Sequence, residues 1–379
     1  MEFALVTSAK VLRARLARDG DAAEHQAIMD DAALVVEADR WGWKYVWTAE
    51  HHFLERYSHM SASEVFLGYA AALTSHIHLG SGIFNLNPSV NHPVRVAERV
   101  AMLDHLSDGR FEFGTGRGAG SLEVTGFDIP DAGDTTRAAW DEVIREFLPM
   151  WESTDYRHDS ALFRVPHPAS TRPTRNVLPK IWRKPHPPLW VACGNAPTYE
   201  KAARMGLGAL GFSFGSPQAN AANIENYKQQ IGRAEPIGRF VNDNVLLVSM
   251  LVCLDDGRRA REVMARSGSQ ETSALAGYYH DTFNRDGRPA PVDTGTDLSL
   301  EEVDSAIAGG RLVCGDPDEV IDQLQAFVDV GCDQIGFLLP MSVPMDHAVE
   351  TIRLVGRHVI PKLDPDPEHR TSRFRALAA

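Results

Sequence analysis

Cysteine is scarce in this sequence. The 379 residues include four cysteines, which are widely spaced and form no C-x-x-C pair and no alternation with histidine. They are Cys193, Cys253, Cys314 and Cys332. This spacing argues against a disulfide framework and against a cysteine-based zinc site. It favours buried, reduced thiols in a cytoplasmic protein.

Runs of basic residues and long apolar segments are also missing. Lys and Arg number 38 against 51 Asp and Glu, giving a net charge of −13 at pH 7. Nucleic acid is therefore disfavoured as the main partner, because binding its phosphates needs clustered basic residues. No segment reaches the roughly 18 apolar residues of a membrane helix, and the apolar run at 3–6 is too short for a signal peptide. We expect a cytoplasmic protein that contacts neither nucleic acid nor membrane.

Short apolar segments alternate instead with amphipathic segments in which apolar residues recur three or four positions apart. The predicted strands are 3–6, 45–48, 77–83, 111–113, 189–192, 209–212, 245–254 and 334–338. The predicted helices are 22–41, 62–73, 94–106, 136–151, 198–205, 317–330 and 345–359. This alternation is typical of βαβ units and a parallel sheet.

We therefore predict an α/β fold, a closed (β/α)8 TIM barrel with insertion segments. An open, doubly wound sheet is the alternative, because periodicity does not report closure. Residues 1–363 are expected to form one barrel domain with insertions near 154–188 and 268–298, both of which would help to decide the substrate. Residues 364–379 read as a polar C-terminal tail.

Four successive predicted strands end in polar clusters. Glu50-His51-His52 follows the second strand, Asn85-Leu86-Asn87 the third, Thr115-Gly116-Arg117-Gly118 the fourth, and Asn195 with Thr198 the fifth. Asn and Thr are common helix caps, so a single cluster proves little. Because ligands of α/β barrels bind at the carboxyl ends of the strands, four clusters together predict one shared pocket.

The adjacent pair His51 and His52 is the first candidate for chemistry. Neighbouring residues of an extended chain point to opposite sides, so the two rings do not easily share a metal ion, and no H-E-x-x-H motif is present. Imidazole titrates near neutral pH and moves a proton in either direction. We expect a general acid or base, or a substrate contact, with a structural histidine as the alternative.

The glycine-rich segment around Gly116 and Arg117 resembles the dinucleotide fingerprint only loosely. More glycines follow it, so no helix starts directly and the Rossmann reading is rejected. Glycines let backbone approach a flat ligand or a phosphate, and a guanidinium matches phosphate oxygens. The start of the helix after Asn195, with Thr198, would attract the same anion. A rim salt bridge and a plain helix cap are the alternatives.

A second motif, Gly211-Phe212-Ser213-Phe214-Gly215, fits the G-x-S-x-G nucleophile elbow of serine hydrolases. Two features argue against a hydrolase. No His-Gly-Gly oxyanion segment precedes the motif, and six predicted strands come before it. A serine hydrolase therefore stays a minor alternative. Ser213 is better explained as the polar end of the sixth strand.

The same clusters resemble the bacterial-luciferase-like flavin monooxygenases. The resembling segments cover most of the chain and are 45–53 (YVWTAEHHF), 92–95 (HPVR), 103–111 (LDHLSDGRF), 114–118 (GTGRG), 188–192 (PLWVA), 198–203 (TYEKAA) and 315–320 (GDPDEV). The resemblance implies a barrel that dimerises through helices near the second and third strands. It also implies a non-prolyl cis peptide near Gly82, in 81–83.

The resemblance further implies that Arg117 and Thr198 hold the phosphate of FMN, with Asn195 beside them, and that His51 is the active-site histidine. His52 and Asn85 would help to place the substrate, and Ser213 would face the flavin ring. Two positions depart from the family pattern. Gly116 replaces the reactive cysteine of luciferase, and Cys193 or Gly194 replaces an acidic residue near the phosphate.

The implied activity is insertion of one oxygen atom of O2 into a small organic substrate. Reduced FMN would come from a separate NAD(P)H:flavin reductase. A deazaflavin F420-dependent oxidoreductase of the same fold is the close alternative, and a non-catalytic flavin-binding subunit is a further one.

Overall fold

The computed structural model describes residues 1–54, 57–118, 121–129, 134–211, 215–267 and 297–379. Parallel strands close into a barrel in the order β10-β12-β1-β2-β3-β5-β8-β9, and β9 pairs back to β10. These strands are β1 (Glu2–Thr7), β2 (Tyr45–Thr48), β3 (His78–Ser81), β5 (Phe111–Gly116), β8 (Leu189–Cys193), β9 (Gly208–Gly211), β10 (Val245–Cys253) and β12 (Gln334–Leu338). The predicted closed eight-strand barrel is confirmed, and the open sheet is wrong.

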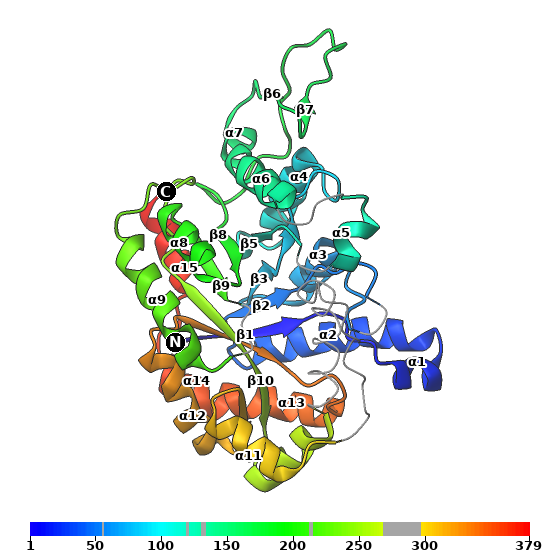
Figure 1. Cartoon of the computed structure of the whole chain (residues 1–379), viewed down its shortest axis with the longest axis vertical. Helices are drawn as coiled ribbons and strands as arrows, with labels where there is room; N and C mark the ends of the chain where they lie inside the picture. The colour runs from blue at the N-terminus through cyan, green and yellow to red at the C-terminus, as the bar shows by residue number, and fades with distance from the viewer. Residues whose placement is uncertain (55–56, 119–120, 130–133, 212–214, 268–296) are drawn as a thin grey trace.

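Helices surround the barrel (Figure 1). The longer ones are α2 (Ala22–Arg40), α3 (Ser63–Leu73), α4 (Pro93–Leu106), α6 (Asp134–Val143), α8 (Ala196–Arg204), α9 (Pro217–Ile231), α11 (Leu300–Ala308), α12 (Pro317–Asp329) and α13 (Met345–Leu354). The shorter elements are α1 (Arg13–Asp19), β4 (Phe84–Asn85), α5 (Ser121–Gly126), η1 (Ile144–Glu146), α7 (Phe147–Glu152), β6 (His158–Asp159), β7 (Arg164–Val165), β11 (Leu312–Gly315), η2 (Val355–Val359), α14 (Ile360–Leu363) and α15 (Arg370–Leu377). In the described part of the chain, no helix combines the length and apolar character that crossing a bilayer requires.

The barrel interior is filled around two tryptophans. The indole rings of Trp47 and Trp190 are buried and meet edge to face, with their centroids 5.1 Å apart. Glycine on a neighbouring strand makes room for each ring: a Cβ atom at Gly80 would lie 2.3 Å from Trp47, and one at Gly208 2.3 Å from Trp190. This layer is a packed core, so a ligand of the barrel must bind above it, at the strand ends.

The first predicted insertion leaves the barrel between α7 and β8. It includes the antiparallel pair β6–β7, at the top of Figure 1. Its later part packs on the turn that precedes β5: Trp182 donates a hydrogen bond to Asp108 (2.8 Å), and the Arg183 N–H donates one to Asp104 (2.9 Å). Because that turn lies at the amino end of β5, this part of the insertion is away from the strand-end clusters. Most of the second insertion, 268–296, lies outside the described residues.

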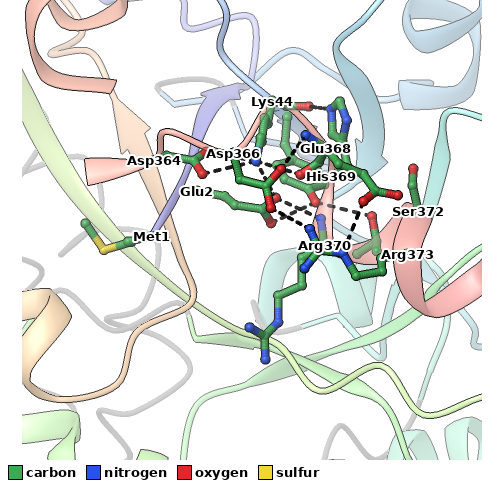
Figure 2. A network of polar contacts seen from close by, with 12 residues as sticks. Met1, Glu2, Lys44, Asp364, Asp366, Glu368, His369, Arg370, Ser372 and Arg373 are labelled. Carbon is green, nitrogen blue, oxygen red and sulfur yellow. Dashed lines mark hydrogen bonds and ion pairs between the residues drawn. The ribbon is translucent and has the colours of Figure 1, made fainter. Parts of the chain in front are cut away.

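The C-terminal segment is more than the polar tail expected from its composition. It forms α15, which lies on the side of the barrel opposite α1 and α5 (Figure 1), and Thr371 and Arg375 of this helix are buried. Figure 2 shows Lys44 at the centre of the contact, where its Nζ lies 3.0 Å from carboxylate oxygens of both Glu2 and Asp364. Sequence pattern missed this packing because the segment is held by polar partners and has no apolar stripe.

A buried acid lies where α15 meets the barrel. Both oxygens of Glu112 accept hydrogen bonds, one from Thr371 (2.5 Å) and one from Trp190 (2.7 Å), and His78 Nδ1 lies 2.7 Å from the same carboxyl group. Burial raises the pKa of Glu112 to about 8 and holds the pKa of His78 well below its usual value. At neutral pH, therefore, the acid is protonated and the imidazole uncharged, and the amino end of the barrel buries no net charge from this pair.

Candidate active site

The polar clusters predicted at the strand ends lie on neighbouring strands. β2 pairs with β3, β3 with β5, and β5 with β8, while β4 continues the line of β3 and places Asn85 opposite Gly116. The segments after β2, β4, β5 and β8 therefore open on one face of the barrel, called the mouth below. This arrangement places His51, His52, Asn85 and Arg117 on the same face of the barrel.

His51 pairs with a carboxylate that sequence analysis did not identify. Its Nδ1 lies 3.1 Å from Oε1 of Glu123, a buried residue of α5. The same oxygen accepts the backbone N–H of His52 at 2.9 Å. Glu123 thus fixes the loop after β2 and orients the His51 ring, because a carboxylate beside one ring nitrogen selects the tautomer.

His52 pairs with a second carboxylate. Its Nε2 lies 3.2 Å from Oε1 of Glu50, which is buried. Burial raises the pKa of Glu50, and Glu64 adds to this, while His52 and Asn91 oppose it. Burial alone would lower the pKa of His52, but Glu50, together with Glu123 and Glu64, raises it above its usual value. Two histidine–carboxylate pairs therefore lie side by side.

Asn91 connects the second pair to Asn85. Its Nδ2 donates to Oε1 of Glu50 at 3.0 Å and to the backbone oxygen of Asn85 at 3.1 Å. The Asn85 side chain is turned back on its own loop, where Oδ1 accepts the backbone N–H of Asn87 (3.0 Å). Asn85 therefore shapes the mouth through its backbone as well as its side chain.

Aromatic side chains line the same part of the mouth. The His51 ring lies 5.4 Å from Tyr57, and the His52 ring lies 4.8 Å edge-on to Phe127, which also contacts Phe53 (5.1 Å). Such an apolar surround strengthens the electrostatic interactions of the two pairs.

Arg117 lies at the end of β5 and is half-buried. Its Nη1 donates to the hydroxyl of Thr136 in α6 at 3.0 Å. Burial lowers its pKa, and the nearby Arg137 adds to this. The same helix reaches α8, because Lys201 of α8 binds Asp141 of α6 at 2.6 Å. Arg117 and α8 are thus both bonded to α6.

The amino end of α8 is exposed to solvent. Asn195 is its N-cap: its side-chain oxygen accepts the N–H of Thr198 at 3.2 Å and the Thr198 hydroxyl at 2.8 Å. Pro197 occupies the first turn, and a Cβ atom added at Gly194 would meet no atom within 4 Å. The cap interpretation of Asn195 and Thr198 therefore holds in this structure, and it leaves room for an anion beyond the helix end.

The glycines of the mouth lie in different local environments. The peptide Gly82–Ile83 is cis, as the resemblance implied for 81–83. The Ile83 side chain covers Gly116, where a Cβ atom would lie 2.6 Å from Cδ1. Gly118 has φ +74° and faces the Asn85 amide. Ser213, and with it the elbow alternative, lies outside the described residues.

A cavity of about 400 Å³ lies beside the mouth, between the segments that follow β1 and β12. Its wall includes the apolar side chains of Leu12 and Met341 and the ammonium of Lys10. Met341 also packs with Leu54 and Tyr57 of the loop after β2. The cavity therefore adjoins the loop that carries the two histidines, and it was not foreseen from the sequence. Among the described residues, no group of three or more His, Cys, Asp or Glu is placed to hold a metal ion.

Comparison with known proteins shows the family of this chain. Residues 1–334 match the model of the luciferase-like monooxygenases. The chain belongs to this family. A curated relative, the oxygenase component of a flavin-dependent trigonelline monooxygenase from Acinetobacter baylyi, is 25% identical over 341 residues, covering 86% of each chain.

Three solved structures share the fold. Monooxygenase RslO1 from Streptomyces bottropensis has a TM-score of 0.79 at 24% identity, covering 96% of this chain and 100% of its own. The oxygenating constituent of 3,6-diketocamphane monooxygenase from Pseudomonas putida, in complex with FMN, has a TM-score of 0.73 at 17% identity, covering 96% of this chain and 98% of its own. The F420-dependent tetrahydromethanopterin reductase from Methanopyrus kandleri has a TM-score of 0.63 at 19% identity, covering 95% of this chain and 99% of its own. Family members thus use FMN or F420.

Proposed function

We propose that this protein is a monooxygenase that binds reduced FMN, supplied by a separate NAD(P)H:flavin reductase. One oxygen atom of O2 enters a small organic substrate and the other leaves as water, while reduced FMN gives up two electrons and two protons. The proposal is supported by the position of a cation, an exposed helix end and two histidine–carboxylate pairs at the carboxyl ends of neighbouring strands.

The phosphate of FMN is assigned to Arg117 and the amino end of α8. A guanidinium offers several donors to a phosphate, and unsatisfied N–H groups at a helix start favour an anion. The open space before Gly194 and the half-buried Arg117 fit such a group. Thr198 would exchange its contact with Asn195 for the phosphate, and Asn195 would remain beside it. The flavin ring would lie against the cis peptide Gly82–Ile83, with the Ile83 side chain, which covers Gly116, as its apolar support.

The two histidine pairs are assigned to proton transfer and substrate placement. His51, oriented by Glu123, is proposed to move a proton to or from the reacting groups. His52 and Asn85 are proposed to position the substrate. The apolar rings of Tyr57 and Phe127 would keep water out, which protects a reduced flavin that is reacting with oxygen.

A hydride-transferring enzyme that uses F420 remains the second candidate, because this fold serves both cofactors. The flavin dependence of the trigonelline relative favours flavin. A non-catalytic flavin-binding subunit is disfavoured, because such a subunit has no physical need for a buried Glu123 paired with His51.

An anaerobic titration with reduced FMN, followed by an oxygen pulse, tests the proposal. We expect saturable binding and, after the pulse, a return to the oxidised flavin spectrum that is slower than for free reduced FMN. Reduced F420 serves as the parallel sample. If only F420 binds and no oxygen is consumed, the monooxygenase proposal is wrong.

We also propose that the active form is a homodimer joined through α3 and α4. Both helices expose apolar side chains at helical spacing, Val65, Tyr69 and Leu73 on α3 and Met102 and Leu106 on α4. Leu106 lies over α3, because a Cβ atom at Gly68 would be 3.9 Å from it. A patch of this kind is suited to pairing with its own copy about a twofold axis.

Sedimentation analysis of Met102→Glu tests the dimer. The buried charge should convert the protein to a monomer without unfolding it, while Leu377→Glu, at an exposed site on α15, should sediment as the wild type. A wild-type chain that is monomeric at micromolar concentration would contradict the proposal.

A further inference from the structure

We propose that Arg99, a residue of α4 behind the mouth, is a positioning residue. It fixes the Asn91 amide against Glu50 and, together with Glu64, sets the electric field at the Glu50–His52 pair. The role in the reaction rests on the proposed function, but the positioning itself does not.

The first step is the orientation of the Asn91 amide. Arg99 Nη2 donates to Oδ1 of Asn91 at 2.7 Å. A guanidinium has donors only, so the amide oxygen must face Arg99, and the amide nitrogen must then face Glu50. Without Arg99 the amide is able to rotate and turn its oxygen toward the Glu50 carboxyl group. That contact would be repulsive for a carboxylate.

The second step is charge neutralisation. The other terminal nitrogen of Arg99, Nη1, lies 2.5 Å from Oε1 of Glu64 on α3, and both side chains are largely shielded from water. Glu64 is one of the charges that raise the pKa of both Glu50 and His52. Arg99 therefore offsets part of a negative charge that acts directly on the pair, in a region where screening by water is weak.

The charged groups around the pair are few in the described structure. His52 faces Glu50 at 3.2 Å, its backbone N–H binds Glu123, and Glu123 also faces His51. Glu64 and Arg99 complete the set from α3 and α4. Removing Arg99 leaves three carboxylates near two imidazoles, so His52 should hold its proton to higher pH.

The titration of His52 in the flavin-free, full-length protein tests the inference. Imidazole signals followed by NMR across pH, with His52→Gln to assign the resonance, report the pKa of His52 directly. We expect Arg99→Met to raise it by about half a unit or more and Glu64→Gln to lower it by a similar amount. The double variant should return close to the wild-type value.

Arg95→Met is the matched control. Arg95 lies one turn earlier on α4, is exposed, and pairs with Glu98 of the same helix, so its loss should leave His52 unchanged. If Arg99→Met folds and does not move the His52 titration, the inference is wrong. If Arg99→Met does not fold, Glu64→Gln is the deciding variant. A His52 pKa that is not lowered by Glu64→Gln would then overturn the inference.

Turnover supplies the second readout. In the oxygen-consuming reaction, Arg99→Met should shift the pH profile of kcat/KM for the substrate to higher pH, because His52 is proposed to place the substrate. The affinity for reduced FMN should stay within about twofold, because no phosphate contact is removed. A failure to bind reduced FMN would overturn the proposed function and leave the NMR result standing. An upward NMR shift with an unchanged pH profile would overturn the role of His52 in the reaction.

Discussion

Replacing His51 with alanine is expected to slow substrate oxygenation by about 100- to 10,000-fold, the usual contribution of a general acid or base. Binding of reduced FMN should change by less than about twofold, because Arg117 and the start of α8, where the phosphate is assigned, belong to other loops. The measurement combines single-turnover oxygenation with an anaerobic binding titration. Glu123→Gln should also slow oxygenation strongly, since the amide no longer stabilises a charged imidazole and can favour the other tautomer of His51.

His59→Ala is the control for this result. His59 comes from the same region of the chain, but its ring pairs with the exposed Glu24 of α2 at 2.6 Å. Its loss should leave the rate within about twofold of the wild type. Full turnover by His51→Ala would remove this residue from the mechanism.

The largest loss of stability is expected from Arg375→Met. Arg375 and Asp104 form a salt bridge of 3.0 Å, and their side chains are 4% and 0% exposed. Arg375 also donates to the backbone oxygen of Gly109 at 2.9 Å. Removing one partner of such a pair leaves an uncompensated charge in the interior, which typically costs about 3–5 kcal/mol. Urea unfolding should show this as a lower midpoint with an unchanged slope.

Arg373→Met provides the comparison within α15. Arg373 pairs with Asp366 and Glu368, but its side chain is 47% exposed. An exposed pair contributes about 1 kcal/mol or less. Equal losses for the two variants would show that burial is not what makes the Arg375–Asp104 pair important. A double variant, Asp104→Leu with Arg375→Met, should recover much of the loss, because both charges are then gone.

The strands of this protein were predictable because each is a short apolar run between turn residues, and that signal survives without tertiary context. The sequence favoured closure of the barrel without deciding it, since periodicity is the same in open and closed sheets. The segment predicted as one strand over 77–83 is interrupted at Gly82–Ile83, where β3 ends and β4 begins. The helix predicted over 136–151 contains the 3-10 turn η1. Neither break changes hydrophobic spacing enough to be visible in the sequence.

The part of the site that could be predicted is the part that follows from the order of the strands. His51, Asn85 and Arg117 follow strands that are neighbours in a barrel, so their meeting follows from topology. Glu123 was missed because it lies in a short helix among glycines, where the sequence predicted no helix near the glycine-rich turn. Asn91 and Arg99 were missed because their roles depend on which side chains lie opposite them, and residue spacing along one helix does not give that.

The pairing of β1 with β12 has a consequence for biosynthesis. β1 is synthesised long before its partner β12, and the Met1 amino group bonds to the backbone of Leu363. Until then β1 offers a bare edge to any other strand, the kind of surface that aggregates. The barrel therefore cannot close until β12 has been synthesised.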